Sequence, residues 1–535
     1  MPKFIRVPPD STGKRVSHAV TMHLDYNNGV EDFTIGDVVV GQTSGVVGVI
    51  GAIVASSTTA EGTLHVILRS GSPESYSIGE ELRVEGVLHA TVASFIPLYA
   101  QQTQIVGGNN TTNAVAVDQR GAIFTRTAEG VHQYDGFGKL ETSQRTAIGE
   151  YIFDRDEGEE DISYEMVGSG DVTHDLPSSS IILSCGTDSG AMARGTTHLY
   201  HKYQAAVAQT INMSLAIGDS GKTNVLRRWG YYDDENGLFF ELDGEQLYVV
   251  VRSSTSGTVQ ETRIPQEEWN DDRLDGSEGL FNLSRLTLNI TKLNLWWIDY
   301  QWLGAGRVRF GILVNGQRIT CHSTRFKEAG TSFPFMRTGT LPVRVMQENT
   351  GVVGSSSEMR TVCWTVSCEG DFNPKTRSFS VPLELPPSSV TSTSFQPLFS
   401  GRSVQTFKGQ DNRVVTLPRS INGYVFTDTA ISVALVKNGE LTGDTWALPI
   451  GPESSVEIDG SASSVSGGRF VWGKVFGPQQ ETEYSLEGQF SYETGETVKR
   501  HANIEEYDTF TLVARKLRDS DPDAEVSFSV NWVEV

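Results

Sequence analysis

Apolar and polar residues alternate with a period of two along most of the chain, which predicts strands rather than helices. Val308, Phe310, Ile312 and Val314 fall on one side of such a strand, and Asn315-Gly316 then turns the chain. Asn-Gly is a strong hairpin signal because both central residues of a type I′ turn have positive φ. The segment therefore predicts a core-facing strand that ends in a hairpin.

Turns of the same kind predict two further hairpins. Residues 240–242 run through Asp243-Gly244 into residues 247–251, and residues 433–437 run into Asn438-Gly439. Turn signals recur at intervals of roughly 8–12 residues, which is the spacing found in sandwiches and barrels.

No long segment combines helical periodicity with capping residues. The best helix candidate is residues 203–211, whose three alanines favour a helix but whose β-branched end suits a strand equally well. Residues 526–532 alternate cleanly and predict a half-buried last strand. We therefore expect an all-β protein of tandem β-sandwich, jelly-roll or barrel modules with very little helix.

Composition divides the chain into four parts. Residues 1–105 are expected to form a small β module, residues 106–370 an aromatic-rich β-sandwich and residues 402–535 a third β module. Residues 371–401 are rich in Pro, Ser and Thr, which predicts an extended, semi-rigid connection.

The first module contains an internal echo. Phe33-Thr34-Ile35-Gly36-Asp37 and Tyr76-Ser77-Ile78-Gly79-Glu80 each precede a short apolar run. The echo predicts two copies of one hairpin-like unit in a small barrel, and the alternative is a chance match of so short a pattern.

The net charge limits the partners. Lys and Arg number 43 and Asp and Glu number 66, so the formal charge is −23. This balance argues against nucleic-acid binding, which depends on cations that neutralise phosphates. No apolar run approaches the roughly 18 residues of a membrane helix, and the N-terminus lacks the apolar core of a signal peptide. We therefore expect synthesis and assembly in a cytoplasm, without membrane insertion.

The cysteines do not form a metal-binding or redox motif. The four residues, Cys185, Cys321, Cys363 and Cys368, form no C-x-x-C pair, so no zinc ribbon or thioredoxin motif is predicted. Cys363 and Cys368 are an odd number of residues apart on a predicted strand and should face opposite sides. Buried free thiols are expected.

Residues 217–223 contain the tempting string Gly-Asp-Ser-Gly-Lys-Thr. A P-loop needs glycine where Ala216 stands, and a helix should follow. A serine protease with the same letters would need a His–Asp pair, and His132, His174 and His198 stand in no supporting context. A turn between strands is the preferred interpretation.

One pair of histidines and two acidic runs are candidate metal sites. His198 and His201 are three residues apart, so on a strand they point to opposite faces. The acidic runs 154–161 and 233–237 offer oxygen ligands for calcium, but neither has the spacing of an EF-hand. Acidic surface turns are the preferred interpretation, and no metal or other cofactor is predicted.

Five of the 9 tryptophans lie between residues 227 and 302. Trp296, Trp297 and Trp302 are the candidate interface residues, with core packing, a protein interface and glycan binding as the open alternatives. Trp296 and Trp297 are adjacent, so they cannot both face inward on a regular strand.

Several segments together resemble a module of structural proteins from tailed bacteriophages, cyanophages among them. The resemblance covers about residues 110–325 and is carried by residues 118–126, 201–204, 227–240, 269–276 and 297–311. It implies a non-enzymatic virion component of the tail, baseplate, fibre or capsid surface. It also implies a homo-oligomeric β-sandwich that contacts other virion proteins, and no catalytic or cofactor-binding residue.

The sequence is therefore compatible with three functions. The first is a virion structural protein that works through protein interfaces, for which aromatic and arginine residues are well suited. The second is a receptor- or glycan-binding module of the virion for host attachment. The third is a polysaccharide depolymerase, for which no carboxylate pair can be chosen from the sequence.

Overall fold

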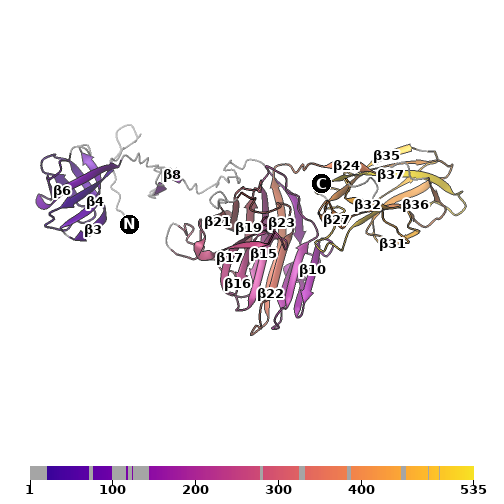
Figure 1. Cartoon of the computed structure of the whole chain (residues 1–535), viewed down its shortest axis with the longest axis horizontal. Coiled ribbons are helices and arrows are strands. Elements are labelled where there is room, and N and C mark those ends of the chain that lie inside the picture. Colours follow the sequence, from indigo (N-terminus) through magenta and orange to yellow (C-terminus); the bar gives the residue numbers. More distant parts are fainter. Residues whose placement is uncertain are drawn as a thin grey trace. The chain divides into compact units, whose positions relative to one another are not determined.

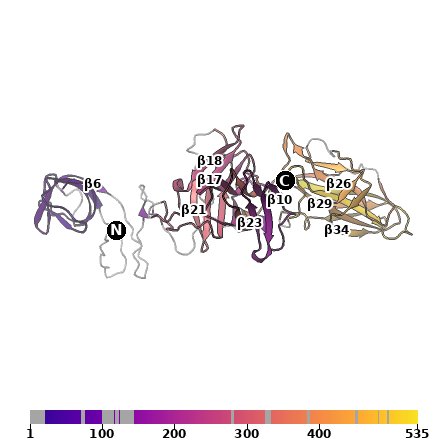
Figure 2. The same ribbon diagram turned by 90° about the horizontal axis from the view of Figure 1, so that it is seen from below.

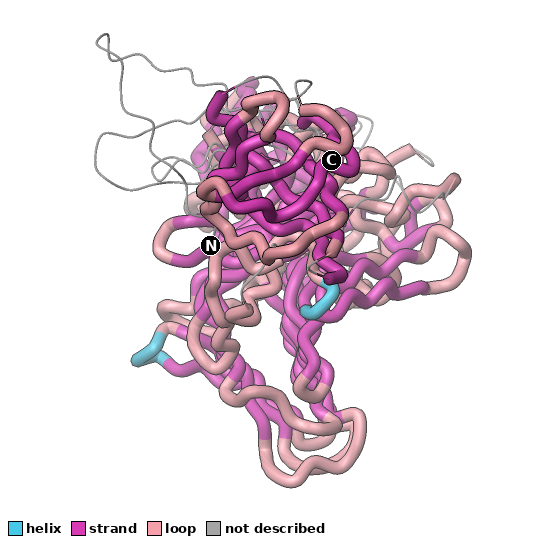
Figure 3. The backbone as a smooth tube through the Cα atoms, turned by 90° about the vertical axis from the view of Figure 1, so that its left-hand side faces the viewer, coloured by secondary structure: helices cyan, strands magenta, loops and turns pink. Residues whose placement is uncertain are grey.

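The computed structural model describes residues 21–58, 60–70, 76–98, 116–117, 123–124, 144–277, 281–324, 332–381, 387–447, 453–479, 481–492 and 495–535. It confirms the all-β class. The only helices in this part of the chain are two single 3₁₀ turns, η2 (Leu176–Ser178) and η3 (Gln266–Glu268), cyan in Figure 3. Neither could cross a membrane, and no longer apolar helix occurs among the described residues. The chain divides into two compact units, Met1–Val131 and His132–Val535.

The first unit contains a closed six-stranded barrel, in which the strands follow the order β1-β4-β3-β2-β5-β6. The indigo strands form a ring in Figure 2. The strands are β1 (Thr21–Asn27), β2 (Val38–Gly41), β3 (Val47–Thr58), β4 (Glu61–Ser70), β5 (Glu81–Val84) and β6 (Val87–Leu98). A separate ladder joins β7 (Ala116–Val117) to β8 (Ile123–Phe124).

The two echoed segments of the barrel take the same conformation. The Thr34 amide donates to the Asp37 carboxylate at 2.7 Å, and the Ser77 amide donates to the Glu80 carboxylate at 2.7 Å. The glycine before each acid has a positive φ, 105° and 88°. The strands that follow, β2 and β5, pair with each other.

The second unit begins with a sandwich of two antiparallel sheets, magenta to orange in Figure 1. The seven-stranded sheet runs β10 (Ile162–Val167), β13 (Met192–Thr197), β22 (Val343–Asn349), β15 (Val225–Tyr232), β16 (Gly237–Asp243), β17 (Gln246–Ser253) and β18 (Gln260–Pro265). The eight-stranded sheet runs β11 (Gly170–Asp175), β12 (Ser180–Cys185), β23 (Ser357–Glu369), β14 (Gln209–Ile217), β19 (Asn294–Tyr300), β20 (Val308–Val314) and β21 (Gln317–Thr324), with β9 (Arg145–Ile152) also paired to β23.

The inward-facing side chains of both sheets form one aromatic core. The Trp296 ring centroid lies 5.0 Å from that of Trp229 and 4.8 Å from that of Phe240. The predicted inward row of β20 is confirmed, since Val308, Phe310 and Ile312 are buried and belong to this core. Alternation along each strand thus supplies the core directly.

A second sandwich completes the unit. One sheet runs β24 (Arg377–Ser380), β37 (Ala524–Glu534), β29 (Thr416–Val425) and β35 (Glu481–Ser485), with β25 (Ser388–Val390) beside β37. The other runs β32 (Val456–Asp459), β26 (Gln396–Ser403), β36 (Thr509–Lys516), β30 (Ile431–Lys437) and β34 (Arg469–Phe476). Short ladders join β27 (Thr406–Phe407) to β28 (Gln410–Asp411) and β31 (Glu440–Thr442) to β33 (Ser464–Ser466).

The predicted connection at 371–401 is corrected by this sandwich. Strands β24, β25 and the start of β26 fall within it and pair in the two sheets. Proline is tolerated there because Pro397 lies at a register shift, where the ladder needs no amide donor.

The turn predictions have different outcomes. Asn315 and Gly316 have φ of 50° and 76° and close the β20–β21 hairpin, and Gly244, at 60°, helps to close β16–β17. The hairpin at Asn438-Gly439 is wrong, because β30 pairs with β34 and β36 while β31 pairs with β33.

The helix candidate 203–211 is not a helix. Ala206 has a left-handed φ of 69°, and the chain enters strand β14 at Gln209. Ile211 then packs in the sandwich core. Tertiary burial of the β-branched end therefore overrides the preference of the alanines for a helix.

Candidate functional site

The outer face of the seven-stranded sheet carries an array of arginines and carboxylates. Most of its members are the outward residues of strands whose alternate positions face the core, so the array follows largely from period-two alternation. We call it the arginine–carboxylate face. It consists of Arg194, Arg228, Arg252, Arg263, Arg344, Glu165, Asp234, Glu241, Asp243 and Glu261.

Strand register aligns several members in one row across the sheet. From β10 to β17 the directly opposed residues are Glu165, Arg194, Met346, Arg228, Glu241 and Tyr248. Opposite charges on neighbouring strands attract one another in such a row. The sheet pairing therefore places the charges of the face at defined positions.

Two aromatic rings lie beneath the middle of the face. The Tyr232 and Phe239 ring centroids are 4.5 Å apart, and both side chains are buried. The Arg252 guanidinium lies 5.6 Å from the Tyr232 centroid and 5.1 Å from that of Phe239. Arg228 covers Phe239 at 5.4 Å, and Arg344 covers Tyr232 at 5.3 Å. Stacking on the rings restricts the guanidinium groups, so the face is preorganised.

Glu241 is the innermost carboxylate of the face. It accepts hydrogen bonds from Nε of Arg228 and Nε of Arg263, each at 2.6 Å, and its side chain is 0% exposed. A general acid must reach the bond that it protonates. Glu241 is enclosed, so it holds the two arginines in place and is not accessible to a substrate.

The rim of the face is open to solvent. Asp234 lies 2.6 Å from Arg344 and 3.7 Å from Arg194, yet its side chain is 74% exposed. Burial alone would raise the pKa of Asp234, but Arg344 and Arg194 outweigh it and lower the pKa. Glu165 and Asp243 are also about half exposed. The rim thus offers ionised acceptors beside guanidinium donors.

The Tyr232 hydroxyl is the unusual group of the face. The side chain is 1% exposed, and this oxygen has no hydrogen-bond partner among the described residues. Burial raises the pKa of Tyr232, although Arg344, Arg228 and Arg252 oppose that shift. An unsatisfied buried hydroxyl costs roughly 1–3 kcal/mol.

The candidate tryptophans lie elsewhere in the same sandwich. Trp296 is 1% exposed and faces the core, whereas Trp297 is 2% exposed and faces outward from the eight-stranded sheet. Trp302 is half-buried and donates from Nε1 to the Met336 carbonyl at 2.9 Å. The expected opposite orientation of the adjacent pair is observed. However, neither Trp296 nor Trp297 offers an exposed ring to a partner.

Trp297 is covered by its own sheet. Its Nε1 donates to the Ile312 carbonyl at 3.0 Å, and the Arg318 guanidinium lies 4.9 Å from its centroid. A Cβ on Gly311 would lie 2.3 Å from the ring, so the indole occupies the space that a side chain would fill. Trp297 therefore packs on the glycine of the neighbouring strand.

The side chains of His198 and His201, which were candidates for a shared metal, do not lie together. His201 is fully buried, with Nε2 2.9 Å from the Tyr151 hydroxyl, while His198 stacks on His501 of the second sandwich. Burial, together with His501, lowers the pKa of His198 to about 3, and burial lowers that of His201 to about 3. Both imidazoles are therefore neutral at ordinary pH.

The remaining motifs are structural. Residues 218–224 form a turn between β14 and β15, and the Asp219 carboxylate there accepts two hydrogen bonds from Arg227 at 2.8 and 2.9 Å. In the acidic run 233–237, the Asp233 carboxylate accepts the amides of Glu235 and Asn236, which is the geometry of an Asx turn.

All four cysteines are free thiols. Cys185, Cys321 and Cys368 are buried and Cys363 is half-buried. Cys368 packs in the core while Cys363 lies on the other face of β23, as their spacing predicts. Burial raises the pKa of each thiol, which does not suit a nucleophile.

Sequence reasoning missed the arginine–carboxylate face. The usable signal was the outward half of the alternation, for example Glu241 and Asp243 between inward Phe240 and Leu242. Charged residues at every second position of several strands predict a polar sheet face, but they do not reveal which strands are neighbours.

Among known proteins, solved structures are similar to part of this chain. No protein-family model matches the chain, and no curated protein matches it either. A legume lectin-like domain from Entamoeba histolytica is similar over 41% of this chain and 97% of its own, with 11% identity and a TM-score of 0.25. A beta-1,3-glucanase from Mycobacterium marinum is similar over 41% and 98%, with 10% identity and a TM-score of 0.29. The beta-glucanase of Bacillus licheniformis has 9% identity and a TM-score of 0.26 over 41% and 96%.

Proposed function

We propose that this chain is a non-enzymatic binding protein of a tailed-phage virion, and that the arginine–carboxylate face of its central sandwich holds a glycan of the host surface. The single observation that carries the glycan assignment is the preorganised, charge-balanced array on the outer face of the seven-stranded sheet. The virion assignment rests on the resemblance of residues 110–325 to phage structural modules.

The chemistry of the face suits a polyhydroxylated ligand. A sugar hydroxyl both donates and accepts hydrogen bonds, and the face sets guanidinium donors beside carboxylate acceptors. The exposed Asp234 carboxylate beside Arg344 and Arg194 is such a pair. The half-buried Tyr248 ring lies elsewhere on the same face, opposite Glu241, and the Arg263 guanidinium stacks on it at 4.3 Å from its centroid.

The charge balance argues against a polyanion as the ligand. Five arginines are matched by five carboxylates on the face, and the chain as a whole carries −23. Binding to a nucleic acid would require excess cations that neutralise phosphates. A neutral or weakly charged glycan is not repelled by the acidic chain and needs no excess of cations.

The enclosure of Glu241 favours binding over hydrolysis. Glycoside hydrolysis needs two accessible carboxyl groups about 5–9.5 Å apart on either side of the scissile bond. Glu241 is 0% exposed between two arginines, and Asp243 is paired with Arg263 at 2.8 Å. Hydrolysis of host polysaccharide by the purified chain would contradict this part of the proposal.

Glycan binding is tested with the full chain on an array of bacterial surface glycans, followed by titration of the best ligand. Arg263→Ala removes a rim donor and is expected to weaken binding by about tenfold or more, since a lost charge-assisted contact is worth about 1.5–3 kcal/mol. Tyr248→Ala removes the ring on which Arg263 stacks and is also expected to weaken binding.

Arg360→Ala is the matched control. Arg360 lies on the eight-stranded sheet, is paired with Asp175 and is 32% exposed, against 35% for Arg263. Binding that Arg263→Ala and Arg360→Ala weaken equally, or no binding to any glycan, would refute the glycan assignment. Absence of the chain from purified virions by mass spectrometry would refute the virion assignment separately.

A further inference from the structure

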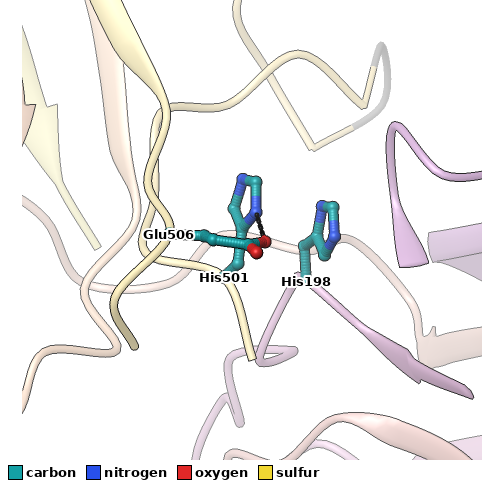
Figure 4. Close-up of side chains that lie close together, drawn as sticks. All are labelled: His198, His501 and Glu506. Atoms are coloured by element: carbon teal, nitrogen blue, oxygen red, sulfur yellow. Dashed lines mark hydrogen bonds and ion pairs between the residues drawn. The ribbon is translucent and has the colours of Figure 1, made fainter. Parts of the chain in front are cut away.

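We propose that His198, His501 and Glu506 form a binding site for a divalent transition-metal ion, with zinc as the best match, which fastens the two sandwiches of the second unit together. One potential ligand atom from each residue lies within 4.8 Å of the other two (Figure 4). Two imidazoles and one carboxylate are a donor set that zinc takes readily, with a water in the fourth position.

The ligands come from both sandwiches. His198 follows the end of β13 in the central sandwich, while His501 and Glu506 lie in the loop that precedes β36. The His501 amide donates to the Glu506 carbonyl at 3.0 Å, and an isolated bridge joins Arg500 to Tyr507. The loop therefore presents His501 and Glu506 as a fixed pair.

The spacing of that pair fits a metal. His501 Nδ1 lies 3.3 Å from a Glu506 carboxylate oxygen. Zinc bonds to nitrogen and oxygen of about 2.0–2.1 Å at tetrahedral angles place two ligand atoms about 3.3 Å apart. The Glu506 side chain is 59% exposed, so an ion can enter from solvent.

Each histidine already has a hydrogen-bonding partner at its other ring nitrogen. His198 Nδ1 lies 3.1 Å from the Glu160 carbonyl oxygen, which leaves Nε2 as the ligand atom. His501 Nε2 lies 3.2 Å from the Asp508 carboxylate, which leaves Nδ1. A carbonyl or carboxylate behind the imidazole is the usual support of metal-binding histidines.

Two lysines hold Asp508 in place behind His501. Lys499 and Lys437 lie 3.5 and 3.7 Å from its oxygen. The support of His501 is therefore fixed from both sides.

The two rings must turn out of their stack to bind the ion. Their centroids are 3.7 Å apart and their planes differ by 7°, so both nitrogens cannot point at one ion without rotation. A bound ion would replace the ring stack with bonds from both sandwiches.

The experiment uses the full chain after treatment with a chelator. Zinc is titrated calorimetrically, and cobalt is used as a spectroscopic probe of four-coordinate binding. One zinc per chain is expected. Glu506→Gln and His501→Gln should each abolish the site, and Asp508→Asn should weaken it by about 10–100-fold.

His174→Gln is the control, because His174 is a half-buried histidine of the same sandwich whose Nε2 contacts the Phe153 carbonyl at 2.8 Å. Glu506 is exposed, so its variant should retain the fold, which the melting temperature without metal checks. No zinc binding, or zinc binding that survives both Glu506→Gln and His501→Gln, would overturn the site. Glycan binding is measured separately and does not depend on this result.

Discussion

At the level of single side chains, folding buries His198 and His201 and thereby keeps both imidazoles neutral. Burial, aided for His198 by the neighbouring His501 and Lys499, lowers the pKa of each from 6.5 to about 3. Asp508 and the backbone of Glu160 act in the opposite direction and raise the pKa of His198, but they are outweighed. The unfolded chain therefore takes up protons at these two residues before the folded chain does.

The sign of the pH dependence follows from that difference. Both histidines contribute full stability above about pH 6.5, and this contribution is lost as the pH falls towards 3, because the unfolded state then binds more protons. Each histidine costs up to about 1.4 kcal/mol per pH unit in this window. His198→Gln should reduce, and not abolish, the loss of stability between pH 7 and pH 4 (about three pH units). Urea unfolding at both pH values measures it, and an unchanged slope would contradict the prediction.

At the level of secondary-structure elements, the neighbouring strands explain why Trp297 is buried. Strand β19 pairs with β20 so that Trp297 lies directly opposite Gly311. The ladder between β20 and β21 shifts register between Phe310 and Gly311, which brings the Ile319 carbonyl close to the glycine. The indole fills the resulting space, and the tryptophan is buried without entering the core.

Gly311→Ala tests this packing. The added Cβ would lie 2.2 Å from the Ile319 oxygen and 2.3 Å from the Trp297 ring, so strand or ring must move. We expect a loss of about 1–3 kcal/mol in the free energy of unfolding, the usual cost of overpacking. Gly354→Ala, where a Cβ meets nothing within 4 Å, should change it little. Equal stability of the two variants in urea would show that β20 accommodates the side chain.

The whole molecule consists of two compact units, of which the first has a barrel core and the second has one core in each sandwich. The barrel core contains residues such as Leu24 and Val66, whereas the two sandwiches belong to one unit and touch directly. At their junction the Arg413 guanidinium lies 4.0 Å from the Tyr200 centroid, and His198 stacks on His501. The sandwiches are therefore expected to unfold together and the barrel separately.

Calorimetry of residues 1–131 and 132–535 tests this division. Each piece should fold alone, and the two melting transitions should add up to those of the full chain, because each unit has its own hydrophobic core. Arg413→Ala should lower the transition of the larger piece only. A single transition of the full chain that neither piece reproduces would contradict two independent units.

Much of the fold is predictable from the sequence because it rests on local rules. The Asn315-Gly316 turn and the inward row of β20 depend on residues next to each other in the chain. The Asn438-Gly439 hairpin could not be judged that way, since β30 finds its partners β34 and β36 elsewhere. The strands at 377–403 were missed because their proline-rich composition outweighed a short alternating pattern.

The site was less accessible to sequence reasoning than the fold. The three tryptophans attracted attention as large aromatic residues, yet two are buried within the sandwich. The arginines and carboxylates of the proposed glycan face are unremarkable one by one, and they become an array only when seven strands are placed side by side.

By itself the sequence determined the all-β class, most turns, the free cysteines and the absence of a P-loop at Ala216, because these follow from residue spacing and local backbone chemistry. Only the tertiary structure decided that Glu165 and Tyr248 share one row, that Trp297 packs on Gly311, and that His198 meets His501. The physical reason is that strand order and sandwich contacts join residues far apart in the chain, and no local pattern encodes which of them become neighbours.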